Sequence, residues 1–199
     1  MNPELLPDGD SDEDLLRRIV VGDAAAFTAL FRRRQSDIYR FALHMTGLPA
    51  VAEDVTQDVF LALMRDAGRY DAGRATVKAW LAGIARNHAL RRLDRDRRSV
   101  PLEDDHEEPA LTVQADSLDA LTRTERIEAL RKAILTLPVP YREAVVLCDL
   151  QELTYAEAAA ALDCAVGTVR SRLHRGRALL GTKMRVEAPA PGRASRCLA

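Results

Sequence analysis

Apolar side chains recur every three or four residues through most of this chain, which is the spacing of one face of an α-helix. The alternation typical of β-strands is almost absent. Breaks that contain glycine, at 22–23, 47–49 and 68–73, divide the first half into four helical segments. The pattern therefore predicts an all-α protein, in which helices resume at about Leu118 and continue to about Arg185.

A stretch without this periodicity separates the two halves. Residues 99–120 carry seven acidic and no basic side chains, and Pro101 and Pro109 interrupt the stretch further. Such a composition argues against packed structure, so we predict a flexible acidic linker. The predicted organisation is a flexible leader at 1–11, a small helical domain at 12–98, the linker at 99–117, a second small helical domain at 118–185 and a tail at 186–199.

The second domain contains the sequence pattern of a helix-turn-helix over residues 137–180. Thr154 and Glu157 have the spacing of a capping box, which starts the helix before the turn. Gly167 is expected to supply an unusual backbone geometry in the turn, and Thr168 is expected to cap the helix that follows. Such a motif can place its last helix in the major groove of DNA.

The last helix of this motif divides into an apolar and a cationic face. Val169, Leu173, Gly176 and Leu180 recur at helical spacing and are predicted to point inward. The positions left facing outward are Arg170, Ser171, His174, Arg175 and Arg177. Arginine can bind guanine through two hydrogen bonds and serine can bind either base edge, so this face suits DNA. A solvated cationic surface is the alternative interpretation.

The net charge of −1 conceals two basic regions. Residues 23–98 carry fourteen basic and nine acidic side chains, and residues 163–185 carry six basic and one acidic side chain. The acidic linker lies between them. Two basic modules joined by an acidic tether indicate a protein that binds a polyanion at two places.

Other kinds of chemistry find no support in the sequence. It contains no nucleophile–base pair, phosphate-binding loop or cluster of metal ligands, so we predict no enzyme activity, cofactor, metal or small-molecule substrate. Cys148, Cys164 and Cys197 have no C-x-x-C spacing, and the first two are expected to be reduced thiols in a cytoplasmic protein. We find no signal peptide and no apolar run long enough to cross a membrane, so membrane insertion is not expected.

Three stretches, in order, resemble motifs of bacterial sigma factors of the sigma-70 family, and most closely those of the compact extracytoplasmic-function (ECF) group. Residues 52–60 resemble the helix that binds the clamp of RNA polymerase, 78–87 the helix that reads the −10 element, and 137–180 the domain that reads the −35 element. The resemblance covers about residues 15–185. It implies three partners, which are the RNA polymerase core, promoter DNA and an anti-sigma factor.

The resemblance also implies roles for individual residues. Those expected to contact the polymerase core are Asp54, Gln57, Asp58 and Leu61, which form a polar stripe on one helix. Those expected at the −10 element are Asp71, Arg74, Lys78, Arg86, Asn87 and Arg91, the first two in a loop that holds a base flipped out of the duplex. Those expected at the −35 element are Arg170, Ser171, His174 and Arg175 on base edges, with Thr168, Arg172 and Arg177 at or near phosphates.

Two further expectations concern the helix that reads the −10 element. Arg86, Asn87 and Arg91 are expected to share one face of this helix, where asparagine can pair with adenine and arginine can hold phosphates. Trp80, which lies on the apolar stripe, is expected to pack in the core rather than to stack on a base.

A stand-alone helix-turn-helix regulator that binds duplex DNA is the alternative function. Residues 137–180 would look much the same in such a protein. The acidic stripe at 54–58 and the basic helix at 86–91 favour the sigma factor, because a stand-alone regulator needs neither.

Overall fold

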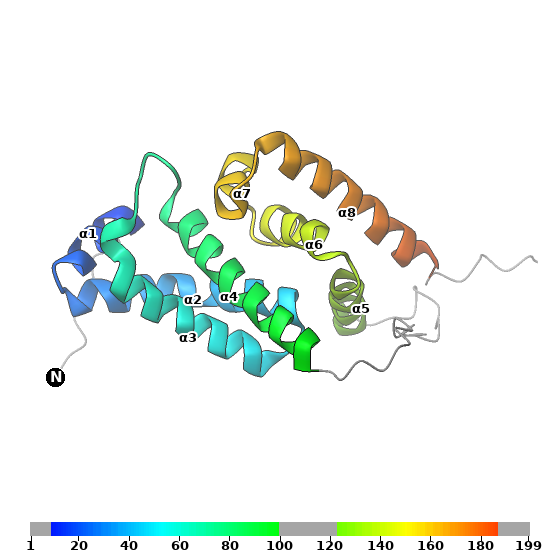
Figure 1. Cartoon of the computed structure of the whole chain (residues 1–199), viewed down its shortest axis with the longest axis horizontal. Coiled ribbons are helices and arrows are strands. Elements are labelled where there is room, and N and C mark those ends of the chain that lie inside the picture. Colours follow the sequence, from blue (N-terminus) through cyan, green and yellow to red (C-terminus); the bar gives the residue numbers. More distant parts are fainter. Residues whose placement is uncertain (1–8, 100–122, 187–199) are drawn as a thin grey trace, which may run out of the picture.

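The computed structural model describes residues 9–99 and 123–186, and most of these residues are helical (Figure 1). Residues 1–8, 100–122 and 187–199 lie outside the described part, and they include most of the predicted leader and nearly all of the predicted linker and tail. No strand occurs in the two described ranges, and the predicted all-α fold is confirmed.

Four helices and one 3₁₀ turn form the first module. Their bounds are α1 (Asp12–Val20), α2 (Ala24–Thr46), α3 (Pro49–Asp66), η1 (Ala67–Arg69) and α4 (Val77–Ser99). Ser11 and Asp14 form a capping box at the start of α1, and Asp23 caps α2 by accepting hydrogen bonds from two backbone N–H groups. Gly47 ends α2 in the left-handed conformation, with φ at 76°, and Pro49 occupies the first turn of α3.

Buried apolar side chains of the four helices meet in the core of this module. Phe41 of α2, Leu63 of α3 and Leu81 of α4 are almost fully buried, and α1 adds Leu15 and Leu16. Because each helix contributes a single apolar face, the polar residues of α3 and α4 are directed away from the core. The core therefore fixes which residues of α4 are available to a partner.

Four helices and a π-helical turn form the second module. Their bounds are α5 (Arg123–Leu135), α6 (Val139–Val145), η2 (Val146–Leu150), α7 (Tyr155–Leu162) and α8 (Val166–Val186). The predicted capping box of Thr154 and Glu157 starts α7. Helix α8 packs on α6, and a Cβ atom on Gly176 would lie 2.8 Å from Val145 Cγ2 and 3.2 Å from the carbonyl oxygen of Tyr141. Gly176 therefore permits the close approach of two helices.

The turn between α7 and α8 differs from its prediction. Asp163, not Gly167, takes the left-handed backbone conformation, with φ at 49°. The carbonyl oxygen of Ala165 accepts a hydrogen bond from the N–H of Thr168, because α8 already begins at Val166. Gly167 and Thr168 lie inside the first turn of α8, so the predicted turn and capping roles of these two residues were wrong. Aspartate can replace glycine here because its short polar side chain tolerates the left-handed region.

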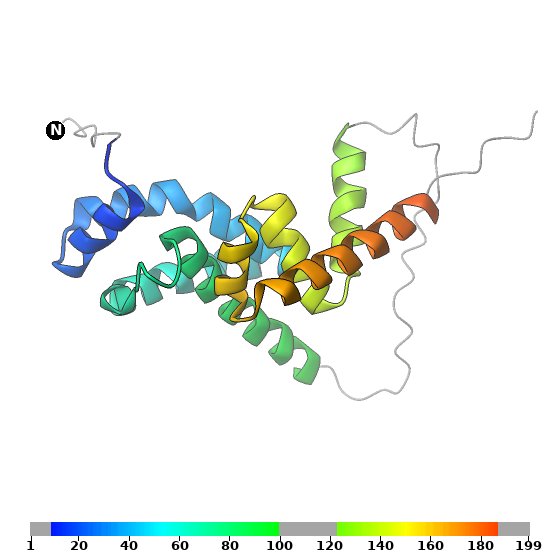
Figure 2. The same cartoon turned by 90° about the horizontal axis from the view of Figure 1, so that it is seen from above.

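The two modules pack against each other (Figures 1 and 2). Helix α7 lies on α4, and a Cβ atom on Gly83 would be 3.3 Å from the carbonyl oxygen of Ala161. Helix α5 reaches the end of α2, where a Cβ atom on Gly47 would lie 2.9 Å from Leu135 Cδ1. Buried residues of both modules belong to one hydrophobic cluster. The linear pattern does not reveal this contact, because residues that join the modules follow the same helical period as residues within each module.

Candidate nucleic-acid interface

The amphipathic division predicted for the recognition helix is present in α8. Val169, Leu173 and Gly176 are buried and Leu180 is half-buried. The exposed residues are Arg170, Ser171, His174, Arg175 and Arg177, whereas Thr168 and Arg172 are half-buried. The residues predicted at the −35 element therefore lie on one helix, and the four predicted on base edges are all exposed.

Neighbouring groups orient part of this surface. The guanidinium of Arg170 lies over the ring of Tyr155, 5.6 Å from the ring centre. A cation–π contact at an exposed position contributes about 0.5–1 kcal/mol and restricts the directions that the Arg170 side chain samples. The hydroxyl of Ser171 donates a hydrogen bond to the carbonyl oxygen of Thr168 at 3.0 Å. In this arrangement the oxygen lone pairs of Ser171 are left to accept hydrogen bonds from a base.

Arg177 is engaged by the second module itself. Its Nε and Nη2 atoms donate to the two carboxylate oxygens of Asp149 in η2, at 3.0 and 2.5 Å. The hydrogen bonds to Asp149 raise the pKa of Arg177 above its usual range, so the guanidinium is charged at every physiological pH. Arg177 therefore links α8 to η2. A phosphate can reach the exposed side of its guanidinium group.

The basic and amide residues predicted at the −10 element do not share one face of α4. Asn87 and Arg91, which are four residues apart, are both exposed. Arg86 contacts the second module, where its Nε atom donates to Oε1 of Glu143 at 2.6 Å. Adjacent residues of a helix point about 100° apart, which separates Arg86 from Asn87. The expected cluster of Arg86, Asn87 and Arg91 was therefore wrong.

Lys78 is also engaged by the second module, and the loop before α4 carries the two remaining predicted residues. The Nζ atom of Lys78 donates to the carbonyl oxygen of Gln151 at 2.6 Å. Asp71 and Arg74 are exposed in the loop. Oδ1 of Asp71 accepts a hydrogen bond from the N–H of Gly73 at 2.8 Å, so Asp71 shapes the loop through its own backbone.

Tyr70 and Trp80 anchor this loop to the helical core. Their ring centres lie 5.5 Å apart, and the hydroxyl of Tyr70 donates to the carbonyl oxygen of Ala75 at 2.9 Å. Burial, followed by the negative charge of Glu13, raises the pKa of Tyr70. Trp80 is half-buried and packs against the hydrophobic core, which fits its predicted packing role. Tyr70 and Trp80 thus hold both ends of the loop against the helices, and the exposed residues of the loop lie between them.

The polar stripe predicted on α3 divides into two parts. Asp54 and Asp58 accept hydrogen bonds from the guanidinium of Arg92 on α4, each at 3.2 Å. Gln57 and Leu61 lie in a groove between α2 and α3, and Leu61 is 56 % exposed. Arg92 therefore partners both carboxylates within the module, although Asp54 is itself 56 % exposed.

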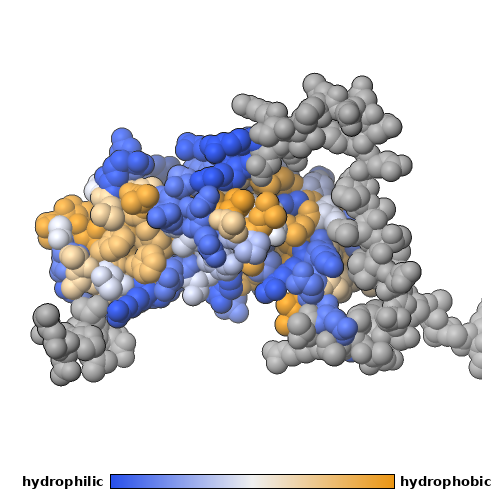
Figure 3. All heavy atoms as spheres, turned by 90° about the horizontal axis from the view of Figure 1, so that it is seen from below, coloured by the Kyte–Doolittle hydropathy of each residue, from blue (hydrophilic) through white to orange (hydrophobic). Residues whose placement is uncertain are grey.

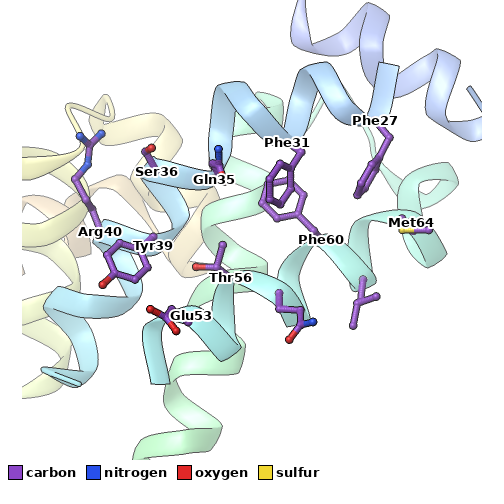
Figure 4. Close-up of a pocket in the computed structure, with 12 residues that line it drawn as sticks. Phe27, Phe31, Gln35, Ser36, Tyr39, Arg40, Glu53, Thr56, Phe60 and Met64 are labelled. Atoms are coloured by element: carbon purple, nitrogen blue, oxygen red, sulfur yellow. The ribbon is translucent and has the colours of Figure 1, made fainter. Parts of the chain in front are cut away.

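The groove between α2 and α3 has a volume of about 870 Å³ and aromatic walls (Figure 4). The ring centres of Phe31 and Phe60 lie 4.6 Å apart, and Phe27 meets Phe60 edge to face at 6.2 Å. Apolar surface gathers at this α1–α3 end of the molecule, on the left of Figure 3. The lining residues are Phe27, Phe31, Gln35, Ser36, Tyr39, Arg40, Glu53, Thr56, Gln57, Phe60, Leu61 and Met64. An exposed apolar groove of this kind indicates a docking surface.

The groove was not predicted from the sequence, although a signal for it exists. Phe27, Phe31 and Tyr39 lie at multiples of four residues along α2, and all three are half-buried. They form a second stripe beside the buried one that includes Leu30 and Ile38. An apolar face wider than the core requires is the feature that points to a docking surface.

Residues 9–99 and 123–186 contain neither a cluster of metal ligands nor a membrane-spanning helix. No group of three or more His, Cys, Asp or Glu side chains in these ranges is placed to hold a metal ion. No helix in them has both the length and the apolar character needed to cross a bilayer.

Cys148 in η2 offers a test of the structure around Arg177. Burial, and secondarily the charge of Asp149, raises the pKa of the Cys148 thiol to about 11. Because the thiolate is the reactive form, we expect native Cys148 to react with iodoacetamide at pH 8 on the order of a hundredfold more slowly than in urea-unfolded protein. Mass spectrometry of the Cys148 peptide over time measures both rates. Equal rates would contradict the burial of this turn.

Both modules are similar in sequence to known protein families. The family Sigma-70 region 2 matches residues 30–99, and Sigma-70, region 4 matches residues 127–180. The ECF RNA polymerase sigma factor SigM of Mycobacterium tuberculosis is 38 % identical over 174 residues, which are 85 % of this chain and 83 % of SigM.

Two solved structures share the fold. CnrH, in complex with the cytosolic domain of CnrY, has a TM-score of 0.68 and 25 % identity, over 90 % of this chain and 100 % of CnrH. The sigma factor RpoE of Bartonella quintana, in complex with the anti-sigma factor NepR, has a TM-score of 0.61 and 28 % identity, over 80 % of this chain and 97 % of RpoE. The chain therefore belongs to the extracytoplasmic-function sigma factors of the sigma-70 family, and the resemblance found in the sequence is confirmed.

Proposed function

We propose that this chain directs the RNA polymerase core to specific promoters and helps to open them, in the cytoplasm and without covalent chemistry of its own. One observation carries the proposal: a region 2 module with Asn87 and Arg91 exposed and a region 4 module with an exposed basic helix occur in a single chain. Two DNA-directed surfaces of different chemistry suit a protein that binds a promoter at two places.

The groove between α2 and α3 is the proposed docking surface for the clamp of the polymerase. Gln57 and Leu61 are the predicted contact residues that line it. A helix of the partner with an apolar face can cover Phe31 and Phe60, as amphipathic helices do in apolar grooves. In this proposal Asp54 and Asp58 hold α3 on α4 through Arg92 and contact the core only at its edge.

The first module is proposed to bind the −10 element as a separated strand. Asn87 can pair with an adenine edge through two hydrogen bonds, and Arg91 can hold a phosphate. Asp71 and Arg74 lie in the loop proposed to receive a flipped base. Extrusion of a base costs a few kcal/mol, which contacts in the loop must offset.

Helix α8 is proposed to enter the major groove of the −35 element. Arg170, Ser171, His174 and Arg175 are proposed to reach base edges, and Thr168, Arg172 and Arg177 to lie near phosphates. Because Asp149 holds Arg177 in one direction, Arg177 positions the helix rather than reads the sequence.

Arg175→Ala and Arg177→Ala are expected to affect −35 recognition differently. Loss of Arg175 should remove about 1–3 kcal/mol of discrimination between a matched and a mismatched −35 element. Loss of Arg177 should weaken binding to all sequences alike and lower the salt slope by about one. Competition binding of the holoenzyme to both DNAs over a salt series measures the two effects. Uniform weakening by Arg175→Ala would place Arg175 on a phosphate instead.

In vitro transcription on a promoter library tests the proposed function as a whole. Core polymerase with this chain is expected to select start sites that share sequences near −35 and −10. Absence of any selection would contradict the proposal. Strong, sequence-specific binding of duplex promoters by the chain alone would favour the stand-alone regulator.

An anti-sigma factor is the proposed regulator of the free chain. RpoE of Bartonella quintana, which shares the fold, was solved with the anti-sigma factor NepR. The apolar groove between α2 and α3 is exposed in the chain alone. A regulator that covers this groove would exclude the polymerase core, and competition between the two for labelled chain measures this exclusion.

A further inference from the structure

Tyr155 of α7 contacts a candidate base-reading residue of α8. The guanidinium carbon of Arg170 lies over the tyrosine ring, 5.6 Å from the ring centre. Tyr155 is 39 % exposed and Arg170 is exposed, so the pair lies at the surface of the helix-turn-helix. The helix before the turn therefore takes part in the surface that α8 presents to DNA.

The start of α7 fixes the position of the tyrosine ring. Tyr155 is the first residue of α7 and directly follows the capping residue Thr154. The N–H of Thr154 donates to Oε2 of Glu157 at 2.9 Å, and the N–H of Glu157 donates to Oγ1 of Thr154 at 3.2 Å. Helix α7 also packs against α8. Because a tyrosine side chain has few rotatable bonds, its ring on this backbone is a stiff support for Arg170.

An aromatic ring and a carboxylate hold an arginine in different ways. Arg177, about two helical turns along α8 from Arg170, donates from Nε and Nη2 to Asp149, which also offsets its charge. A ring attracts the cation through its face and takes up none of the N–H groups in the guanidinium plane. Within the described ranges, no hydrogen bond or ion pair engages the guanidinium of Arg170. Tyr155 therefore holds Arg170 and leaves its donors available to a base.

Restriction of Arg170 before binding bears on which group of the DNA it contacts. A guanidinium can bind guanine through two hydrogen bonds, and it can bind a phosphate through the same donors. A mobile arginine loses side-chain entropy at either site. A side chain that is already held in one direction loses less entropy at the site in that direction, so binding there is favoured over the other.

We propose that Tyr155 determines specificity at the −35 element, because its ring holds the guanidinium of Arg170 on the edge of one guanine. Tyr155 is a positioning residue, since it acts through Arg170. The pair supplies discrimination at a single base pair. Arg175, which lies about 140° round α8 from Arg170, is directed to a different base pair. This inference rests on the proposed role of α8 at the −35 element.

Two substitutions of Tyr155 separate the ring from the rest of the side chain. Tyr155→Leu keeps an apolar side chain but removes the aromatic face, whereas Tyr155→Phe keeps the ring and removes only the hydroxyl. Because Tyr155 is partly exposed, both variants should unfold at nearly the wild-type temperature. Arg170→Ala identifies the base pair that Arg170 reads, and Arg175→Ala identifies a control base pair read from the same helix.

The test is selection of DNA by holoenzyme from a promoter library randomised over the −35 element. Sequencing of the bound DNA gives the relative preference for each base at each position. Tyr155→Leu should reduce the preference for guanine about threefold at the base pair that Arg170 reads, the factor that an exposed cation–π contact supplies. The preference at the base pair that Arg175 reads should not change. Tyr155→Phe should keep both preferences, and Tyr155→Leu added to Arg170→Ala should cause no further loss.

Three outcomes would overturn the positioning role of Tyr155. Full preference for guanine in Tyr155→Leu means that the ring does not position Arg170. Equal losses at the base pairs of Arg170 and Arg175 mean that the substitution disturbs the helix-turn-helix as a whole. A loss by Tyr155→Phe as large as that by Tyr155→Leu means that the hydroxyl, rather than the ring, supplies the specificity.

The same selection distinguishes this inference from the proposed function. If the wild-type holoenzyme prefers particular −35 sequences and Arg170→Ala relaxes one base pair, while Tyr155→Leu relaxes none, the positioning role alone is wrong. If Arg170→Ala relaxes no base pair, Arg170 does not read a base and the positioning role is overturned with it. If the wild-type holoenzyme shows no −35 preference at all, the proposed role of α8 is wrong as well.

Discussion

Leu61→Asp is expected to abolish stable binding of the RNA polymerase core while the fold is retained. Leu61 is 56 % exposed and lines the groove between α2 and α3, so its replacement meets water in the free chain. In the proposed complex the new carboxylate is buried against an apolar partner without a cation. Burial of an unpaired charge costs roughly 4 kcal/mol, which lowers the affinity about a thousandfold.

Titration of core polymerase with a fluorescently labelled chain measures this loss. Ile127→Asp is the matched control, because Ile127 is 44 % exposed on α5, outside the groove. Both variants should unfold at nearly the wild-type temperature. Wild-type affinity of Leu61→Asp for the core would show that the groove is not the docking surface, and an equal loss for Ile127→Asp would show that any added charge is sufficient.

Local chemistry explains what could be predicted from the sequence. The buried positions of α8, such as Val169 and Leu173, follow from helical spacing alone, and so do Val55 and Val59 of α3. The capping box at Thr154 is equally local. Each of these features depends on residues within one or two helical turns, where the period of 3.6 residues is sufficient information.

Features that depend on distant residues were not predictable in the same way. Arg86 and Asn87 are neighbours in the sequence, yet one binds Glu143 and the other is exposed. The partner of Arg86 lies 57 positions away and is supplied by a contact between modules. Asp54 and Asp58 likewise differ from Leu61 in having a partner within the chain, because Arg92 of another helix donates hydrogen bonds to both carboxylates. Charge and periodicity identify candidate contact residues, but tertiary packing decides which of them are already occupied.

The error at the helix-turn-helix has a different cause. Gly167 was the most permissive residue near the turn, so it was assigned the unusual backbone geometry. The chain instead places Asp163 in the left-handed region and starts α8 at Val166. Aspartate can visit the left-handed region because its short polar side chain can form local hydrogen bonds, so the turn does not require a glycine.

Asn87→Ala is expected to slow promoter opening while binding to the core is unchanged. Asn87 is exposed on α4, in the other module from α8, and the groove proposed for the core is formed by α2 and α3. Loss of a two-hydrogen-bond contact with adenine costs about 1–3 kcal/mol, which corresponds to a roughly tenfold to hundredfold loss in open complex. Permanganate reactivity of unpaired thymines near −10 measures opening, and the core titration supplies the control.

Comparison with Arg86→Ala sharpens this prediction. Asn87 is exposed in the packed arrangement, so its removal should affect only the step in which the strand is bound. Arg86 is instead paired with Glu143 in the packed arrangement, so its removal should affect the contact between the modules more than the bound strand. Asn87→Ala should therefore show the larger opening defect of the two. An equal loss of core binding by Asn87→Ala would place Asn87 at the polymerase rather than at the −10 strand.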